Sequence, residues 1–262
     1  MRNPGRPAVI VPTQAIDADE LAAECAAAAA TGIVDAVEWR IDPLLVVASG
    51  SAQGGVHRSA HSLAEAALRL LPSALTAELP ILVTVRTCFE GGQVEIAEDD
   101  YAEVVRELIA GVAVNVDSGV PVAIDVEIDR AASVSLIASA QEAGVPVVAS
   151  HHNFESTDSA ERLLKTFAAM SEAGAHVAKV AMMPQAPADV LRLLEATAAA
   201  DASLPVPVLG ISMGCLGRTS RIMGADFGSC ATFAQIGQAS APGQIEASVL
   251  AEILDRVGPR CG

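Results

Sequence analysis

An amine inside an apolar segment is the most chemically informative feature of this sequence. Of the 16 lysine and arginine residues, only Lys165 and Lys179 are lysines. Lys165 falls in an amphipathic helical pattern, whereas Lys179 interrupts the apolar run HVAKVAMM. One interpretation is a lysine whose ammonium group extends along apolar surface to water. The other is a desolvated amine that attacks a ketone and forms an imine. An arginine cannot do this, and we favour the second interpretation.

Two consecutive histidines offer acid–base chemistry. His151 and His152 directly follow an apolar run at 145–150. A histidine at a strand end often does no more than hydrogen bond to the backbone, but a pair at a functional edge favours a role in proton transfer. Because successive strand residues point to opposite faces, only one of the two should face a pocket.

Acidic and arginine side chains end three further apolar runs. Glu38 and Arg40 end one run, Arg86 ends the next, and Asp125 and Glu127 end a third. One interpretation is structural, with the carboxylates as ion-pair partners of the arginines. The other is that these groups surround a polar ligand, and the residues alone leave both open.

A metal centre is the remaining interpretation of these polar groups. Its ligands would have to come from Glu38, Glu127 and His152. A lysine and two arginines in the same pocket would compete electrostatically with a cation. We therefore expect no metal.

Eight short apolar runs alternate with eight helical patterns. The apolar runs cover 8–11, 33–38, 81–86, 122–128, 145–150, 177–182, 206–212 and 228–233. The helical patterns cover 17–31, 60–76, 99–117, 131–143, 156–173, 186–200, 215–225 and 244–257. Nearly continuous apolar strands between amphipathic helices predict a parallel sheet. Eight such units predict an α/β protein with a closed (β/α)8 TIM barrel, a fold that takes ~250 residues.

Local signals refine these boundaries. Asp17, with Glu20 three residues later, predicts a capping box at the first helix. Ser156 or Thr157 is the predicted start of the fifth helix. The segment 43–60 is rich in Ser, Gly and Ala and predicts a flexible surface loop.

In a barrel, polar residues that are far apart in the sequence can lie together at one face. The carboxyl ends of all eight strands meet at one face, which is where barrel enzymes carry their active sites. We expect the strand-end residues to converge there on one pocket. No composition shift divides the chain, so we expect a single domain over 1–262.

Composition excludes several function classes. The formal net charge is −16 with no basic face in view, which argues against nucleic-acid binding. No apolar run reaches the ~20 residues of a membrane span. The cysteines occur as an odd number without a CxxC pair, which favours reduced thiols; they are Cys25, Cys88, Cys215, Cys230 and Cys261. With no leader pattern at the N-terminus, we expect a soluble cytoplasmic protein without a membrane partner.

A set of short motifs, in chain order, carries a family resemblance. They are EWRID at 38–42, TVRT at 84–87 with EGG at 90–92, DVEI at 125–128, SHHNFEST at 150–157, KVAMMP at 179–184, ISMG at 211–214, SR at 220–221, FGSCATF at 227–233 and ASAPGQI at 239–245. Together they resemble the class I 3-dehydroquinate dehydratases, also called type I, from about residue 33 to 245.

The resemblance implies a fold, an activity and a set of site residues. Members are (β/α)8 barrels, usually homodimers, that convert 3-dehydroquinate to 3-dehydroshikimate in the shikimate pathway without cofactor or metal. It implies that Lys179 forms the imine, that His152 is the general acid and base, and that Glu127 orients His152. The residues implied to bind substrate are Glu38, Arg40, Arg86, Met213, Arg221, Phe233, Ser240 and Gln244.

The sequence also departs from the family pattern. Relatives usually have an aromatic residue where His151 stands and an aspartate where Asn153 stands. Relatives often carry a β-hairpin that covers the bottom of the barrel, whereas seven residues precede Ala8 here. Glycines near both ends of the loop 234–244 predict a lid over the substrate.

Two other functions use the same barrel. An aldolase-like enzyme would also use a lysine in the sixth strand, but it would want a glycine-rich phosphate site after strands seven and eight. A non-catalytic metabolite sensor should have lost Lys179 or His152, and both are present.

Overall fold

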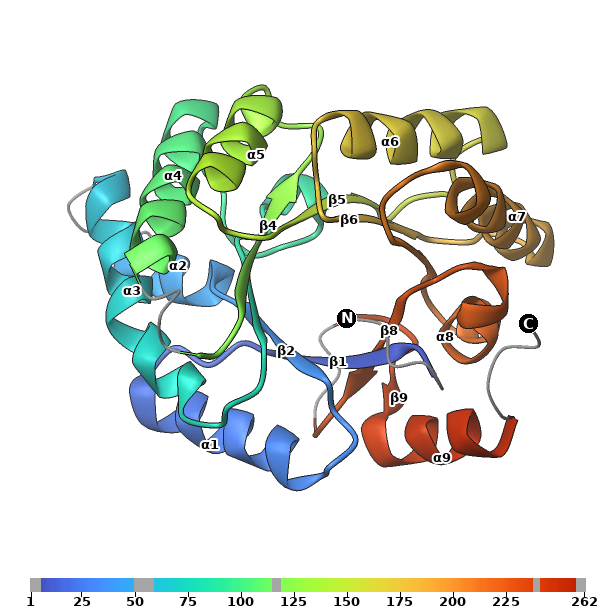
Figure 1. Cartoon of the computed structure of the whole chain (residues 1–262), viewed down its shortest axis with the longest axis horizontal. Coiled ribbons are helices and arrows are strands. Elements are labelled where there is room, and N and C mark those ends of the chain that lie inside the picture. Colours follow the sequence, from blue (N-terminus) through green and yellow to red (C-terminus); the bar gives the residue numbers. More distant parts are fainter. Residues whose placement is uncertain (1–5, 50–58, 115–118, 238–240, 258–262) are drawn as a thin grey trace.

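The protein is a closed barrel of parallel strands with helices around it (Figure 1). The computed structural model describes residues 6–49, 59–114, 119–237 and 241–257. The strands run in the order β7-β6-β5-β4-β3-β2-β1-β8-β9, and each strand is parallel to its neighbours in this order. They are β1 Ala8–Thr13, β2 Ala36–Arg40, β3 Ile81–Thr84, β4 Val122–Glu127, β5 Val147–Asn153, β6 Val177–Met182, β7 Val208–Ser212, β8 Ala231–Gln235 and β9 Ile245–Glu246. A bridge between Val208 and Ser229 joins β7 to the segment before β8 and closes the ring.

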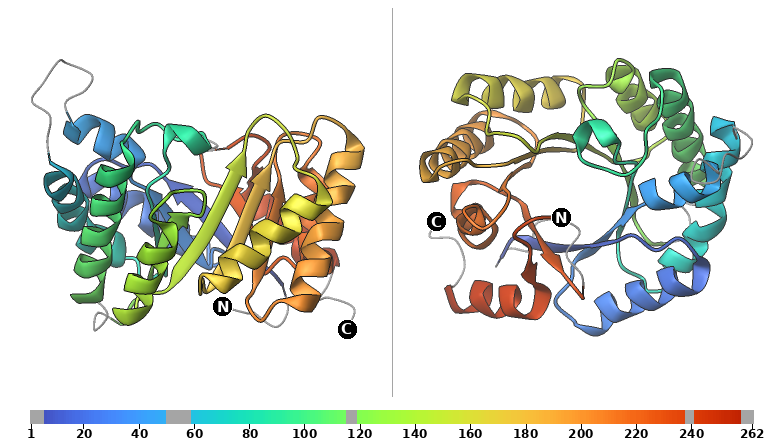
Figure 2. Two further views of the ribbon diagram at one scale, coloured as in Figure 1. Left: turned by 90° about the horizontal axis from the view of Figure 1, so that it is seen from above. Right: turned by 180° about the vertical axis from the view of Figure 1, so that it is seen from behind.

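Helices follow the strands and form an outer layer, which Figure 2 shows from two further sides. The α-helices are α1 Ala18–Ala30, α2 Asp42–Ser49, α3 Ala60–Leu75, α4 Glu98–Val114, α5 Ser133–Glu142, α6 Ala160–Glu172, α7 Pro187–Ser203, α8 Arg218–Met223 and α9 Ala247–Val257. Two short 3₁₀ turns, η2 Cys88–Glu90 and η4 Gly224–Phe227, lie in the loops after β3 and α8. The predicted (β/α)8 barrel is confirmed. Among the described residues no helix is long and apolar enough to cross a membrane.

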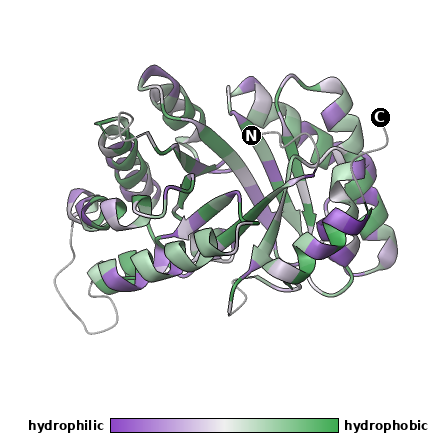
Figure 3. Cartoon of the chain, turned by 60° about the horizontal axis from the view of Figure 1, so that its bottom comes forward, coloured by the Kyte–Doolittle hydropathy of each residue, from purple (hydrophilic) through white to green (hydrophobic). Residues whose placement is uncertain are grey.

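Aliphatic packing between sheet and helices holds this arrangement together. Leu21 and Phe167 are fully buried on the inner faces of α1 and α6, and Trp39 is fully buried on β2. Figure 3 shows the same division, with apolar strands and with polar residues on the outer faces of the helices. Because parallel strands in a barrel are covered on both sides, their sequences are apolar without alternation.

Two sequence-based boundaries are wrong. Within the predicted loop 43–60, residues up to Ser49 belong to α2, and 50–58 lie outside the described residues. Helix α6 is capped by Ser159, not by Ser156 or Thr157, because the Asn153 side chain accepts hydrogen bonds from the backbone of 155 and 156 and holds them in a turn. The predicted cap at Asp17 is confirmed, since its side chain accepts from the backbone nitrogen of Glu20.

The end of the barrel opposite the carboxyl ends of the strands is hollow within the described residues. A largely apolar cavity of about 400 Å³ lies there. Small and proline residues line much of it, among them Ala8, Ala36, Pro80, Ala123 and Pro146. Lys179 and Phe233 line both this cavity and the polar pocket at the other end, so they separate the two compartments.

Replacement of a core aromatic residue tests the packing. Phe167 is 0% exposed beneath α6, so Phe167→Ala should lower the free energy of unfolding by about 3–5 kcal/mol. Phe89 is 70% exposed, and Phe89→Ala should change stability by no more than about 0.5 kcal/mol. Urea denaturation of both variants measures the difference, and equal losses would contradict this assignment of the core.

Candidate active site

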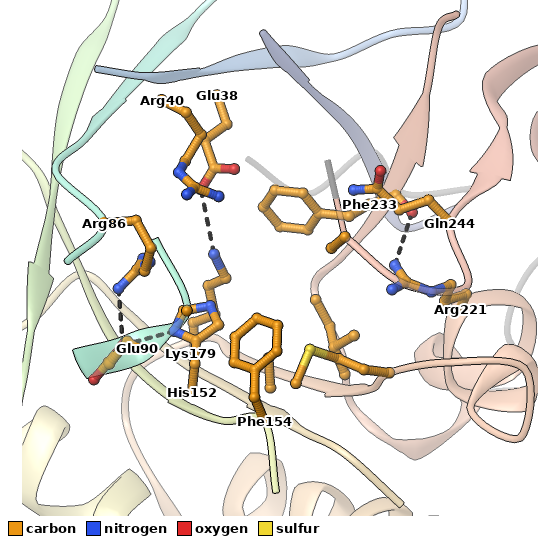
Figure 4. Close-up of a pocket in the computed structure, with 15 residues that line it drawn as sticks. Glu38, Arg40, Arg86, Glu90, His152, Phe154, Lys179, Arg221, Phe233 and Gln244 are labelled. Carbon is orange, nitrogen blue, oxygen red and sulfur yellow. Dashed lines mark hydrogen bonds and ion pairs between the residues drawn. The ribbon is translucent and has the colours of Figure 1, made fainter. Parts of the chain in front are cut away.

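Lys179 lies at the centre of a polar pocket in the barrel (Figure 4). It stands on β6 between Ser150 of β5 and Leu209 of β7, and 4% of its surface is exposed. Its Nζ lies 3.3 Å from Glu38 Oε1 and 4.5 Å from the centroid of the Phe233 ring. The amine is therefore held by one carboxylate and one aromatic face, and it points into the pocket rather than to solvent.

Glu38 is charged despite its burial. Burial alone would raise the pKa of this carboxyl, but Lys179, Arg40 and Arg86 outweigh it and lower the pKa. The Thr84 hydroxyl also donates to its Oε1, at 3.2 Å. Arg40 lines the pocket and is itself fixed by a two-pronged contact with Asp42, at 2.7 and 2.8 Å.

His152 faces the same pocket and contacts Glu90. Its Nδ1 lies 2.7 Å from Glu90 Oε2. Burial, followed by the charges of Arg86 and Lys179, holds the pKa of His152 well below its ordinary value, so the imidazole is neutral. Burial holds the pKa of Glu90 well above its ordinary value, although Arg86 donates to the same Glu90 oxygen and opposes this shift, so Glu90 Oε2 and His152 Nδ1 share one proton across their short contact. This contact occupies Nδ1 and leaves Nε2 as the other ring nitrogen of His152.

The structure corrects the role expected for Glu127. Its carboxylate accepts from the backbone and hydroxyl of Thr87, from Arg86 and from Arg130, and no hydrogen bond to His152 is present among the described residues. The acid that orients His152 is Glu90 instead. Glu127 is fully buried at the end of β4 and secures the loop that carries Glu90.

Sequence reasoning missed Glu90 because it is not a strand-end residue. It lies on η2, four residues beyond Arg86. The adjacent glycines were the available signal. Gly91 is left-handed, with φ of 79°, and its bare Cα packs on the Phe154 ring. A Cβ at Gly92 would overlap the Arg86 carbonyl oxygen. Phe154, which lines the pocket mouth, was also missed.

Arg86 ties these groups together. Its Nη1 donates to Glu90, Glu127 and Ser150, and its Nη2 donates to Asp125. Burial alone would lower the pKa of this guanidinium, but the surrounding carboxylates raise it well above its ordinary value. The guanidinium thus joins the ends of β3, β4 and β5.

Arg221 forms the opposite wall of the pocket. Its guanidinium donates to the backbone carbonyls of Phe233 and Pro242, at 3.2 and 3.0 Å. Within the described ranges it has no carboxylate partner, and burial lowers its pKa to about 10. A buried guanidinium with neutral acceptors only has the charge and geometry that suit a carboxylate.

The pocket collects most of the residues expected from sequence. Those that line it are Glu38, Arg40, Arg86, His152, Lys179, Met213, Arg221, Phe233 and Gln244. Glu127 is absent from this wall, and His151 faces away from it. Ser240 lies outside the described residues, as does the centre of the loop 234–244, so the predicted lid remains a prediction.

Fold and site together define an α/β-barrel protein with a buried amine and a carboxylate-bound imidazole at its functional face. The sequence matches the type I 3-dehydroquinase family model over residues 9–259. The chain therefore belongs to the type I 3-dehydroquinase family.

Individual relatives agree with the family match. The 3-dehydroquinate dehydratase of Klebsiella pneumoniae strain 342 is 38% identical over 233 residues, which cover 86% of this chain and 85% of that protein. The enzyme of the same name from Enterococcus faecalis is 35% identical over 95% of this chain and 92% of its own length. A solved type I 3-dehydroquinate dehydratase from Clostridium difficile, with covalently modified comenic acid, superposes with a TM-score of 0.78 at 29% identity and covers 98% of this chain and 94% of that one.

The loop that carries Glu90 has no room for a methyl group at Gly92. Gly92→Ala should push the Arg86 carbonyl away and lower the free energy of unfolding by about 1–3 kcal/mol. Gly32 meets nothing within 4 Å, so Gly32→Ala should cost only its left-handed backbone strain of about 1 kcal/mol. Denaturation curves compare the two, and a harmless Gly92→Ala would contradict the close approach.

Proposed function

We propose that this protein is a 3-dehydroquinate dehydratase that works through an imine on Lys179. The observation that carries the proposal is the buried Lys179 amine in one pocket with the Glu90–His152 pair. The names of the relatives supply the substrate, since the amine and imidazole alone fit several ketones.

The proposed reaction uses the amine as an electron sink. Lys179 Nζ attacks the substrate ketone, and loss of water leaves an iminium carbon bonded to the lysine nitrogen. His152 Nε2 then removes a proton from the carbon next to the iminium, and the electron pair is stabilised by the cation. The same imidazole returns a proton to the β-hydroxyl, which leaves as water with formation of the C=C bond. Hydrolysis of the iminium releases the product and the free amine.

Substrate contacts are divided between the two walls of the pocket. Arg221 is the proposed partner of the substrate carboxylate, because its charge has only backbone acceptors within the described residues. Glu38, Arg40 and Arg86 are proposed to bind the hydroxyls. Met213 and Phe233 supply the apolar surface against the ring.

The cellular setting forms part of the same proposal. We infer a cytoplasmic homodimer that acts in the shikimate pathway, without cofactor, resident metal or nucleic-acid partner. Membership of the family and the acidic composition, with a net charge of −16, support this setting.

Lys179→Ala tests the imine directly. This variant should lose turnover while keeping its fold, because no other amine is buried in the pocket within the described residues. Borohydride reduction in the presence of 3-dehydroquinate should add one substrate-derived mass to the wild type, and peptide mapping should place it on Lys179. Lys165 is the matched control, since its side chain is 74% exposed in a surface ion pair. An adduct on Lys165, or active enzyme that cannot be trapped, would refute the mechanism.

His152→Ala should slow turnover by ~10²–10⁴-fold, the usual contribution of a general acid–base group. Imine formation should survive, so borohydride should still trap the substrate on Lys179. Glu90→Gln should lower kcat in the same direction by a smaller factor, because Gln cannot balance the charge of a protonated imidazole. His151→Ala should be much milder. Equal losses from both histidine variants would show that the assignment of the base is wrong.

A further inference from the structure

A second cluster of polar groups lies behind the Glu90–His152 pair and shares only Glu90 with the lining of the pocket. Glu90, Asp129 and His151 each bring one ligand atom to within 4.8 Å of the others. The side chains of His151 and Glu90 are 8% and 1% exposed. Asp129, in the turn after β4, is 40% exposed and connects the cluster to solvent.

Several buried polar atoms in this cluster lack a hydrogen bond. They are Glu90 Oε1, both ring nitrogens of His151 and Asp158 Oδ2. His151 Nδ1 lies 2.6 Å from Asp129 Oδ2, a contact that lowers the pKa of Asp129, and Nε2 lies 3.4 Å from Asp158 Oδ2. Buried polar atoms without partners are rare in folded proteins, and a group of them marks a place for a water or an ion.

We propose that Glu90, Asp129 and His151 form a binding site for a late first-row divalent cation such as Zn²⁺. An imidazole nitrogen with two carboxylate oxygens suits zinc and its neighbours, whereas magnesium and calcium prefer oxygen alone. The two carboxylates balance the charge of the ion. This set shares no residue with the substrate-contacting wall of the pocket except Glu90.

The side chains must adjust to hold an ion. Metal–ligand distances of about 2.0–2.2 Å put two ligand atoms of a tetrahedral ion about 3.4 Å apart. His151 Nδ1 and Asp129 Oδ2, now 2.6 Å apart, would therefore separate, and more distant ligand atoms, now within 4.8 Å, would move inward. Asp158 faces the ring nitrogen opposite Asp129, which is where a carboxylate orients a metal-binding imidazole.

The positively charged side chains near the cluster, Arg86 and Arg162, do not contact the Glu90 oxygen that would bind the ion. Arg86 contacts Glu90 through Oε2, 2.8 Å away, and leaves Oε1 toward the cluster. Arg162 contacts Asp158 Oδ2 at 3.1 Å from a side chain that is 65% exposed. His152 lies on the far side of Glu90, where it also contacts Oε2.

Occupancy should inhibit the enzyme. The carboxyl group that contacts His152 through Oε2 would give its other oxygen to the ion, so the ion would pull Glu90 away from the position in which it holds His152. Binding at a site that substrate does not touch would lower kcat without competing with substrate. His151 precedes the proposed general base His152 in the chain, and a metal bound at His151 would thus affect the action of that base.

Cobalt(II) titration of the whole chain tests the site without reference to activity. The probe is Co²⁺ added to a Cys88→Ser background, because the exposed Cys88 thiol lies two residues from Glu90 and would give its own cobalt spectrum. A visible d–d absorption should saturate at one ion per chain, and Zn²⁺ should abolish it. His151→Phe and Asp129→Asn should each weaken cobalt binding by about tenfold or more, whereas His61→Ala, at a side chain 65% exposed, should not.

Turnover measurements then separate the site from the catalytic mechanism. Zn²⁺ should lower kcat of the parent protein, and both variants should keep their basal turnover and lose the inhibition. Asp129→Asn alters an exposed side chain, so it decides the matter if His151→Phe fails to fold. Absence of a cobalt spectrum, or a spectrum that survives both variants, would overturn the proposal and leave His151 as a structural ion-pair partner of the two aspartates.

Discussion

The guanidinium of Arg86 is the interaction on which the arrangement of the site depends. It is 2% exposed and shares its donors among Glu90, Asp125, Glu127 and Ser150. Each buried charge would be costly alone, and removal of one partner of such a network typically costs ~3–5 kcal/mol because the rest are left uncompensated. The network therefore keeps three strand ends and the η2 turn in one relative position. Glu90 is fixed by that turn, and Glu90 in turn fixes His152.

The pocket is divided into a neutralised half and an uncompensated half. On the first side the positive charges of Arg40 and Arg86 are matched by nearby carboxylates. On the second, Arg221 has backbone carbonyls as its partners within the described residues. An anion gains most where a buried cation is unmatched, so an anionic ligand would be favoured on the Arg221 side of the pocket. Lys179 lies between the halves, against Glu38 and the Phe233 ring.

The difference between Glu90 and Glu127 shows why strand-end reasoning goes wrong at one position. Both carboxylates are almost fully buried, and both contact Arg86 through Nη1. Glu127 follows the β4 pleat toward Thr87 and Arg130, whereas Glu90 reaches His152 from a loop. The course of that loop depends on two glycines, one left-handed and one pressed against the Arg86 carbonyl. A residue in such a turn belongs to no helical or strand repeat, so the sequence does not predict where its side chain points.

The sequence by itself determined the fold and most of the residues that line the pocket. The alternation of apolar runs and amphipathic helices over eight units favours a closed parallel barrel over an open sheet. Lys179 was singled out because it interrupts the apolar run that forms β6. Side-chain alternation also placed only one of two adjacent histidines in the pocket. The tertiary structure alone decided which acid contacts His152, that residues 42–49 form a helix, and that His151 meets Asp129 and Glu90. Those contacts join residues up to 62 positions apart through loops, and their geometry is set by packing rather than by any local preference.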